Sequence, residues 1–382
     1  MAAYLDHAAT SPIRPEIAAL ISHLHDQNLG NPSGKHGAAR RATAILDSSR
    51  EEIALIVGGD PGGVIFTSGG TESDNLAIFG ILQRLEKGGK VVISQIEHRA
   101  VLVSAQEACD QFGFELVKAP VGADGVVDID RLNDLMDESV VLVSIMASNN
   151  ELGTIEPISE ISKIVRKMSP HAIVHSDAVQ AAGWLPIGEI FNEVDMISLS
   201  AHKLGGPVGV GALVTKKGVT IAPHNHGGGQ ERGRRSGTVD VVGAASLSAA
   251  LKAVNASEWA KALTLTQSLE KGLRENIKGL EVTVSQDKRV SGTLHVIIQG
   301  VEGEEVLFLL DEYGVAASAG SACSSGSIAP SHVLQAIGAG QSGTAAIRFS
   351  LGWSSNQDEI NEAIVATTKA VEQLRSSTGI PK

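Results

Sequence analysis

The sequence predicts an α/β fold, in which a large domain with a mostly parallel sheet is joined to a smaller α+β domain. Short apolar runs alternate with amphipathic helical patterns up to about residue 250. After that point, long helical patterns flank a few short strand-like runs. Apolar strands that alternate with helices are typical of a parallel sheet buried on both faces.

The first part of the chain carries most of the strand signals. Ile17, Leu20 and Leu24 recur at helical spacing within 15–26, and a second helix is expected over 36–57, before Gly58-Gly59. A further helical pattern covers 159–167. The expected strands are 64–67, 91–94, 140–146, 172–176, 196–200 and 210–214.

The C-terminal third has a different pattern. Helices are expected at roughly 245–278 and 356–376, with strands at 294–299 and 346–351. Asn356 precedes Gln-Asp-Glu, so it is a suitable N-cap with an acidic residue at the third helical position.

Composition restricts the partners and the compartment. The 382 residues include 31 Lys and Arg against 43 Asp and Glu, a net charge of −12, which disfavours nucleic acid and anionic membranes. Only two cysteines are present, so no disulfide framework is expected. The sequence has no apolar leader and no long apolar run, so we expect a cytoplasmic protein without a membrane span. His224 and His226 precede three glycines without a third ligand, so no metal site is expected.

A glycine-rich turn marks a candidate anion site. The segment TSGGTESDN follows the apolar run VIFT and opens a helical pattern, which places Gly70 and Thr71 at a helix N-terminus. A simple turn capped by Thr71 is the alternative, and the Walker A pattern is absent.

Two further strand ends carry polar side chains. Asp177 ends the run AIVHSD, where a carboxylate suits a protonated ring nitrogen, although capping of the next turn is an equal alternative. Lys203 follows a strand in SLSAHKLGG, and a desolvated lysine there can bond covalently to a carbonyl. Ser200 and His202 are candidate phosphate ligands; the alternative for Lys203 is an ordinary surface lysine.

The two cysteines differ in their surroundings. Cys323 lies in ASAGSACSSGS, a segment too poor in apolar residues to be packed, so we expect a mobile, exposed thiol suited to nucleophilic chemistry. Cys109 lies in a helical pattern and is expected in the core.

Together these segments resemble the class V aminotransferase family, and most closely its cysteine desulfurase branch of the NifS/IscS type. The similar text runs from residue 4 to about 352 and includes YLDHAATSP, IFTSGGTESDN, EHRAV, SNNELGTIEPI, HSDAVQAAG, LSAHKLGGPVG, GGGQERGRRSGT and SAGSACSSGS. The text HKLGGPVG and the loop before HSDAV depart from the family pattern without removing a reacting group.

The resemblance implies a homodimeric pyridoxal-phosphate enzyme of fold type I. Its large domain would span 14–250, and its small domain would combine 1–13 with 251–382. The residues that match cofactor contacts are Lys203 (covalent bond), Asp177 (ring nitrogen), His98 (ring stacking), Gln180 (ring oxygen), Asn150, and, for the phosphate, Gly70, Thr71, Ser200, His202 and, from the other subunit, Thr238.

The resemblance also implies the reaction. L-cysteine would be converted to L-alanine, with Asn150 and Arg348 holding its carboxylate and Cys323 taking the sulfur as a persulfide. The sulfur would pass to an acceptor such as an iron–sulfur scaffold. A selenocysteine lyase or another class V enzyme stays open as an alternative, as do a phosphate-binding hydrolase without this cofactor and a non-catalytic scaffold.

Overall fold

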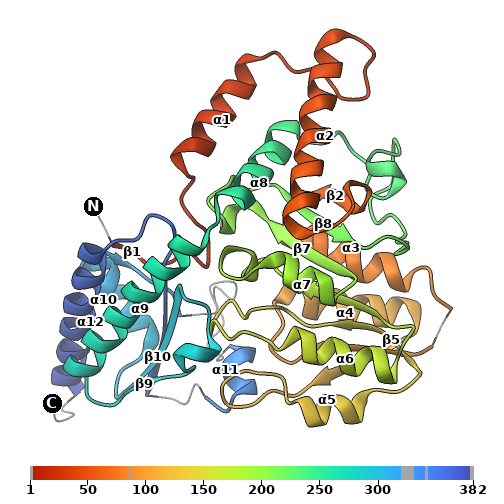
Figure 1. Cartoon of the computed structure of the whole chain (residues 1–382). Coiled ribbons are helices and arrows are strands. Elements are labelled where there is room, and N and C mark those ends of the chain that lie inside the picture. Colours follow the sequence, from red (N-terminus) through yellow and green to blue (C-terminus); the bar gives the residue numbers. More distant parts are fainter. Residues whose placement is uncertain (1–2, 87, 320–330, 340–342, 379–382) are drawn as a thin grey trace.

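A seven-stranded sheet forms the centre of the molecule, within the residues that this computed structural model describes, 3–86, 88–319, 331–339 and 343–378 (Figure 1). Its strand order is β2-β8-β7-β6-β5-β3-β4. β8 is antiparallel to both neighbours, and the other pairs are parallel, which confirms the predicted sheet. The strands are β2 Val64–Thr67, β3 Lys90–Ser94, β4 Glu115–Ala119, β5 Val140–Ser144, β6 Ile173–Asp177, β7 Met196–Ser200 and β8 Gly211–Thr215.

Helices cover both faces of this sheet. Within β3, Val92 packs into one hydrophobic cluster, whereas Val91 and Ile93 pack into another, as the two-residue period of a strand requires. The first cluster includes side chains of α2 Gly37–Val57, α5 Ile129–Leu135, α6 Ile158–Met168, α7 Ile187–Glu193 and α8 Val241–Ala253. The second includes α3 Gly70–Leu82 and α4 Arg99–Phe112.

A third hydrophobic cluster, beside the two on the large sheet, is built from both ends of the chain. β12 (Thr344–Ser350), β10 (Thr293–Gln299) and β9 (Leu280–Val282) form an antiparallel sheet in that order. Ala3 and Leu5 are buried in the same cluster as residues of this sheet. Further elements here are β1 Ala3–Tyr4, which pairs with β11 Val315–Ala316, and α9 Ala256–Asn276, α10 Gly303–Glu312 and α12 Gln357–Thr378. The predicted domain boundaries stay a prediction.

The predicted helix at 245–278 is wrong in one respect, because two helices occupy it. α8 ends at Ala253 and α9 begins at Ala256. Asn255 is extended, and its side chain accepts hydrogen bonds from the backbone of Ser257 and Glu258, which starts a new helix. The cap predicted at Asn356 is confirmed, since Asn356 accepts from the N–H groups of Asp358 and Glu359.

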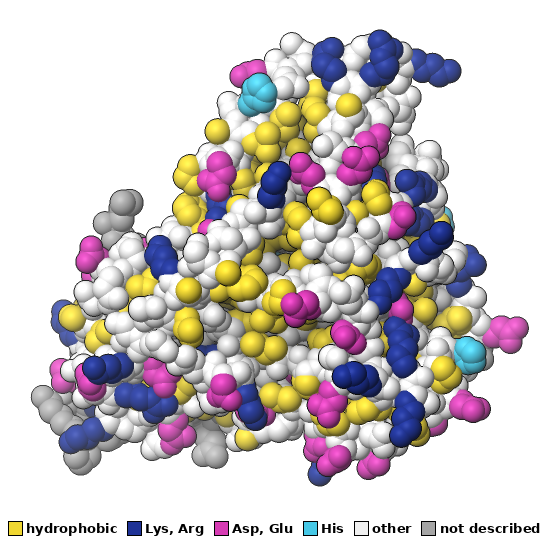
Figure 2. All heavy atoms as spheres, in the orientation of Figure 1, with side chains coloured by type: hydrophobic (Ala, Val, Ile, Leu, Met, Phe, Trp, Pro, Cys, Tyr) yellow, Lys and Arg dark blue, Asp and Glu magenta, His cyan; other side chains and the backbone are white. Residues whose placement is uncertain are grey.

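Apolar side chains gather around one projecting part of the molecule. Figure 1 shows α1 (Pro15–Asp26) and the start of α2 extending beyond the sheet, and Figure 2 shows hydrophobic side chains along this region. Leu55, in the last turn of α2 and so outside this projection, is 82% exposed, and Ile13, just before α1, is 46% exposed. In the described part of the chain, no helix is both long and apolar enough for a membrane crossing.

Glu156 gives the fold a testable pH dependence. Burial raises its pKa from 4.5 to about 8, and its Oε2 accepts a hydrogen bond from the Val127 N–H (2.9 Å). The folded state therefore holds a proton that the unfolded state releases above pH 4.5, so this stability is present at low pH and is lost as pH rises towards 8. The free energy of unfolding of the wild-type protein should therefore decrease between pH 5 and 8. In Glu156→Gln this decrease should be smaller by about 1 kcal/mol per pH unit. Thermal melts across this range test it, with the exposed Glu160→Gln as control; equal slopes in both variants contradict the prediction.

Candidate active site

A cavity of about 290 Å³ lies beyond the carboxyl ends of β6 and β7. Ligands collect at this edge of open α/β sheets. Ten of the predicted site residues line it: Gly70, Thr71, His98, Asn150, Asp177, Gln180, Ser200, His202, Lys203 and Arg348. Thr238 does not line this cavity within the chain, and Cys323 lies outside the described residues.

One end of the cavity suits a phosphate. α3 begins at Gly70, which two residues separate from the end of β2. The residue before it, Gly69 (φ 149°), is the N-cap and has no side chain that could bond the first N–H groups of the helix. The first N–H groups of this helix, with the positive end of its dipole, therefore remain for an anion. A Cβ on Gly70 would lie 2.7 Å from Val179 Cγ2, so glycine lets the backbone pack closely here.

His202 is a neutral ligand at this end. Its Nδ1 lies 3.1 Å from Thr10 Oγ1. Burial, with a smaller effect of the Lys203 charge, lowers its pKa to about 4. A neutral His202 could therefore donate a hydrogen bond to an anion at neutral pH without adding charge.

Two buried carboxyl groups lie at the deep side of the cavity. Asp177 ends β6, and its Oδ1 accepts a hydrogen bond from the Val179 N–H (2.9 Å). Asp74 on α3 also lines the cavity, and its Oδ1 has no hydrogen-bond partner among the described residues. Burial first, and then the Asp177 charge, raise the pKa of Asp74 well above its usual value. Burial raises the pKa of Asp177 as well, but the charges of His98 and Lys203 and the hydrogen bond from Val179 N–H oppose this effect. Of the two carboxyl groups, Asp177 is therefore better placed to carry the negative charge that a ring nitrogen needs.

Sequence reasoning missed Asp74 although the signal was present. It is a carboxyl residue on the buried side of α3, whereas Thr71, Glu72 and Asn75 form the exposed or half-buried polar face of that helix. An ionisable residue on the buried side of a helix has either a partner or a function.

His98 is fixed in one tautomer. It is the N-cap of α4, and its Nδ1 accepts a hydrogen bond from the Ala100 N–H (3.1 Å). Burial is the main reason that its pKa is lowered. The neutral ring therefore carries its proton on Nε2, which can donate or exchange a proton.

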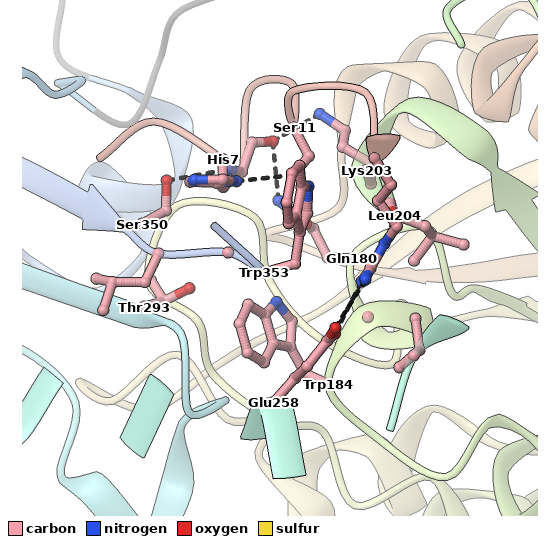
Figure 3. Close-up of a pocket in the computed structure, with 16 residues that line it drawn as sticks. His7, Ser11, Gln180, Trp184, Lys203, Leu204, Glu258, Thr293, Ser350 and Trp353 are labelled. Carbon is pink, nitrogen blue, oxygen red and sulfur yellow. Dashed lines mark hydrogen bonds and ion pairs between the residues drawn. The ribbon is translucent and has the colours of Figure 1, made fainter. Parts of the chain in front are cut away.

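The N-terminal segment holds Lys203 and was not predicted to do so. Lys203 Nζ donates to the backbone oxygens of Ala8 (2.6 Å) and Ala9 (2.7 Å), and Gln180 Nε2 donates to Ala8 O (3.0 Å). Figure 3 shows this turn from a neighbouring cavity whose lining includes His7, Lys203 and Gln180. That cavity, about 30 Å³, is too small for a cofactor.

Arg348 on β12 is 2% exposed and contacts Asn150, the other residue predicted to bind the substrate carboxylate. Its Nη1 donates to Asn150 O (2.7 Å), and its Nη2 lies 2.6 Å from Asp6 Oδ1. A planar guanidinium in a cavity that also contains an amine is suited to the carboxylate of an amino acid.

Residues on both sides of the Cys323 segment are held close to this arginine. Ser318 exchanges backbone hydrogen bonds with Arg348 (3.2 and 2.7 Å). On the other side, Ser331 Oγ lies 2.6 Å from Glu151 Oε2, and Glu151 directly follows Asn150. The chain on either side of Cys323 is therefore anchored next to the predicted substrate groups.

A buried ion pair connects α2 with the loop that precedes Thr238. Arg50 binds both carboxylate oxygens of Glu231 (2.7 and 3.0 Å), and Glu231 Oε2 also accepts from the Phe66 N–H. Glu231 and Arg232 both have positive φ (49° and 59°), which this anchoring maintains.

Removal of this pair is expected to destabilise the protein strongly. Glu231→Ala leaves the guanidinium of Arg50 buried without its partner, so the free energy of unfolding should fall by about 3–5 kcal/mol. Urea denaturation measures it. Arg131→Ala, which breaks an exposed pair with Asp128 (3.5 Å), is the control and should change stability by less than about 1 kcal/mol. A similarly small effect of Glu231→Ala would show that the buried pair does not anchor the loop.

Comparison with known proteins identifies the class. The sequence pattern of the family described as Aminotransferase class-V matches residues 3–362. The chain belongs to this family.

The relatives narrow the class further. The chain is 38% identical over 381 residues to "Cysteine desulfurase IscS" of Dictyoglomus turgidum, covering 98% of this chain and 95% of the relative. A structure described as "NIFS-LIKE PROTEIN" has a TM-score of 0.90 at 32% identity, covering 98% of this chain and 100% of the other. A structure described as "SspA in complex with cysteine" has a TM-score of 0.80 at 32% identity, covering 91% and 98%. The predicted resemblance to the cysteine desulfurase branch is confirmed.

Proposed function

We propose that this chain is a pyridoxal-phosphate-dependent cysteine desulfurase, which converts L-cysteine to L-alanine and leaves the sulfur on Cys323. The observation that carries the proposal is one cavity in which the Lys203 amine, the Asp177 carboxylate, an uncapped helix N-terminus and the Arg348 guanidinium converge. A relative whose name is cysteine desulfurase aligns with 98% of this chain, which supports the proposal.

The residues fit the cofactor at three of its polar groups, namely the phosphate, the ring nitrogen and the aldehyde. The start of α3, with Ser200 and His202, offers hydrogen-bond donors to the phosphate. Asp177 offers a buried carboxylate to the ring nitrogen, and Lys203 offers its amine to the aldehyde. When bound, pyridoxal phosphate supplies an electron sink that stabilises negative charge at the α-carbon of an amino acid.

The side chains of this protein supply the remaining steps. Arg348, together with Asn150, binds the carboxylate of L-cysteine and orients the substrate. The Lys203 amine, once released from the aldehyde, moves the proton at the α-carbon, and His98 Nε2 can exchange a proton nearby.

The sulfur transfer needs no oxidant or reductant besides Cys323 and the substrate. The Cys323 thiolate attacks the substrate sulfur, an S–S bond forms, the Cβ–S bond breaks, and the carbon takes the electron pair and a proton. The products are L-alanine and a persulfide on Cys323. The persulfide then serves an acceptor protein, for which we propose an iron–sulfur scaffold.

We further propose that the protein is a homodimer in the cytoplasm. The apolar side chains along α1 and α2 support a protein interface, since Leu55 is 82% exposed. In the dimer Thr238, which does not line the cavity of its own chain, would contact the phosphate of the partner's site. The cytoplasmic location follows from the reducing compartment that two cysteines suggest.

The purified protein tests the proposal directly. We expect a visible absorption band that changes on addition of L-cysteine, with equal amounts of alanine and transferable sulfur formed without a keto acid. A colourless protein that takes up no pyridoxal phosphate would refute the proposal. Transamination that depends on a keto acid would favour another class V activity, and release of selenium from selenocysteine without activity on L-cysteine would favour a selenocysteine lyase.

A further inference from the structure

The guanidinium of Arg348 already has a carboxylate partner within the protein. Asp6 Oδ1 lies 2.6 Å from Nη2, and the backbone oxygen of Asn150 accepts from Nη1 (2.7 Å). The third nitrogen, Nε, is buried and has no hydrogen-bond partner among the described residues. Of the five N–H groups of Arg348, Asp6 and Asn150 therefore occupy one on each terminal nitrogen, and the Nε–H is among those left for a ligand.

Asp6 is placed by backbone pairing. The segment around it runs along β12, where Ser350 N donates to Leu5 O (2.7 Å) and His7 N donates to Ser350 O (3.1 Å). The N–H groups of Ala9 and Thr10 donate to the backbone oxygen of Asp6 and close a turn. The Asp6 carboxylate is thereby presented to Arg348, with 21% of its side chain exposed.

Asp6 is the charged partner of Arg348 in this environment. The nearby Glu151 binds Ser331 Oγ, and burial raises its pKa, so it is a weaker source of negative charge. His295, also close to Arg348, is buried, and its pKa is lowered to about 3, so it is neutral. A guanidinium that is 2% exposed requires a counter-ion when no ligand is bound.

We propose that Asp6 is the internal counter-ion of Arg348, a positioning residue that holds the guanidinium and limits how tightly the site binds the carboxylate of an amino acid. Asp6 fixes one nitrogen of the fork and offsets its charge. The incoming carboxylate thus meets an oriented but partly neutralised cation. This arrangement favours release of the L-alanine product, and it rests on the function proposed for Arg348.

The experiment compares two amines that differ by a carboxylate. L-alanine and ethylamine are titrated separately into the cofactor-loaded protein, and the absorbance of the bound cofactor reports each Kd. The ratio of the ethylamine Kd to the L-alanine Kd is the carboxylate preference. Asp6→Asn removes the charge and keeps an oxygen acceptor, so we expect L-alanine to bind about five-fold more tightly and ethylamine to be unchanged.

Thermal unfolding gives a readout independent of absorbance. Without ligand, Asp6→Asn should lower Tm, because the buried cation has lost its counter-ion. L-alanine should then raise Tm by more in this variant than in the wild-type protein. The exposed Asp287→Asn is the matched control and should leave the carboxylate preference unchanged.

The outcomes separate this inference from the proposed function. A carboxylate preference that is unchanged or reduced in Asp6→Asn overturns the counter-ion role. If that variant does not fold, Asp6→Ser, which also removes the charge, must raise the preference, and failure to do so has the same meaning. Arg348→Ala should abolish the preference; if it does not, the proposed carboxylate-binding role of Arg348 is wrong, whatever Asp6 does.

Discussion

Replacing Lys203 with alanine should yield a protein that does not hold pyridoxal phosphate covalently. Its rate of L-cysteine desulfurisation should fall by about 10³-fold or more. Two roles are lost together. In the proposed mechanism the amine bonds to the aldehyde and, after its release, acts as the base at the α-carbon. Among the described residues that line the cavity, Lys203 is the one lysine, and the imidazoles of His98 and His202 cannot take its place in that bond.

Chemical labelling of the cofactor distinguishes the loss of the Lys203 amine from general unfolding of the variant. Borohydride reduction of the wild-type protein, followed by peptide mass mapping, should place the cofactor on Lys203. The same treatment of Lys203→Ala should leave every peptide unmodified, with a cooperative melt retained. Lys217→Ala removes an exposed lysine from the turn after β8 and should behave as the wild type. Covalent cofactor in Lys203→Ala, or activity within ten-fold of wild type, would exclude the role assigned to this amine.

The residues at strand ends were predictable because topology alone brings them together. Asp177 ends β6 and Lys203 follows β7, and these strands are adjacent and parallel. Once the apolar runs are recognised as parallel strands, their carboxyl ends must share one edge. Gly70 was predictable for a related reason, since it begins a helix shortly after β2.

The contacts of the N-terminal segment were not predictable in this way. Asp6 meets Arg348, and Ala8 meets Lys203, across 342 and 195 residues of sequence. Both contacts depend on a β-bridge between Asp6 and Ser350. The residues around either partner show no sequence pattern that predicts this bridge. Backbone oxygens such as that of Ala8 also carry no information in the side-chain pattern.

The missed strand β4 has a simpler explanation. It lies at the edge of the sheet, and Glu115 and Lys118 are exposed on it. Edge strands carry charged residues that interrupt the apolar run, which protects the open edge from pairing. The apolar runs expected for buried strands therefore do not appear in Glu115–Ala119.

Replacing Cys323 with serine should abolish persulfide formation while the cofactor absorbance, and its change on adding L-cysteine, remain. Serine keeps the shape of the side chain but cannot form an S–S bond with the substrate sulfur. After incubation with L-cysteine, the wild-type protein should gain the mass of one sulfur atom on the peptide that contains Cys323, and the variant should gain none. Formation of transferable sulfur should fall by about 10³-fold or more.

The chain provides its own matched control in Cys109. This thiol is 1% exposed on α4, and burial raises its pKa to about 11, so it is neither accessible nor ionised at neutral pH. Cys109→Ala should therefore keep the sulfur adduct and the rate. Sulfur found on Cys109, or full activity of Cys323→Ser, would assign the acceptor thiol elsewhere.

Chain length makes the Cys323 assignment physically reasonable. Cys323 follows Ser318 by five residues, and Ser318 is hydrogen-bonded to the backbone of Arg348. Five residues span at most roughly 17 Å, so the chain tethers the thiol within that reach of Ser318, which is hydrogen-bonded to the arginine proposed to bind the substrate carboxylate. Tethering raises the effective concentration of the nucleophile, which free thiols in solution do not match. An added thiol such as dithiothreitol should therefore restore only a small part of the rate to Cys323→Ser, and rescue to the wild-type rate would show that a tethered cysteine is not needed.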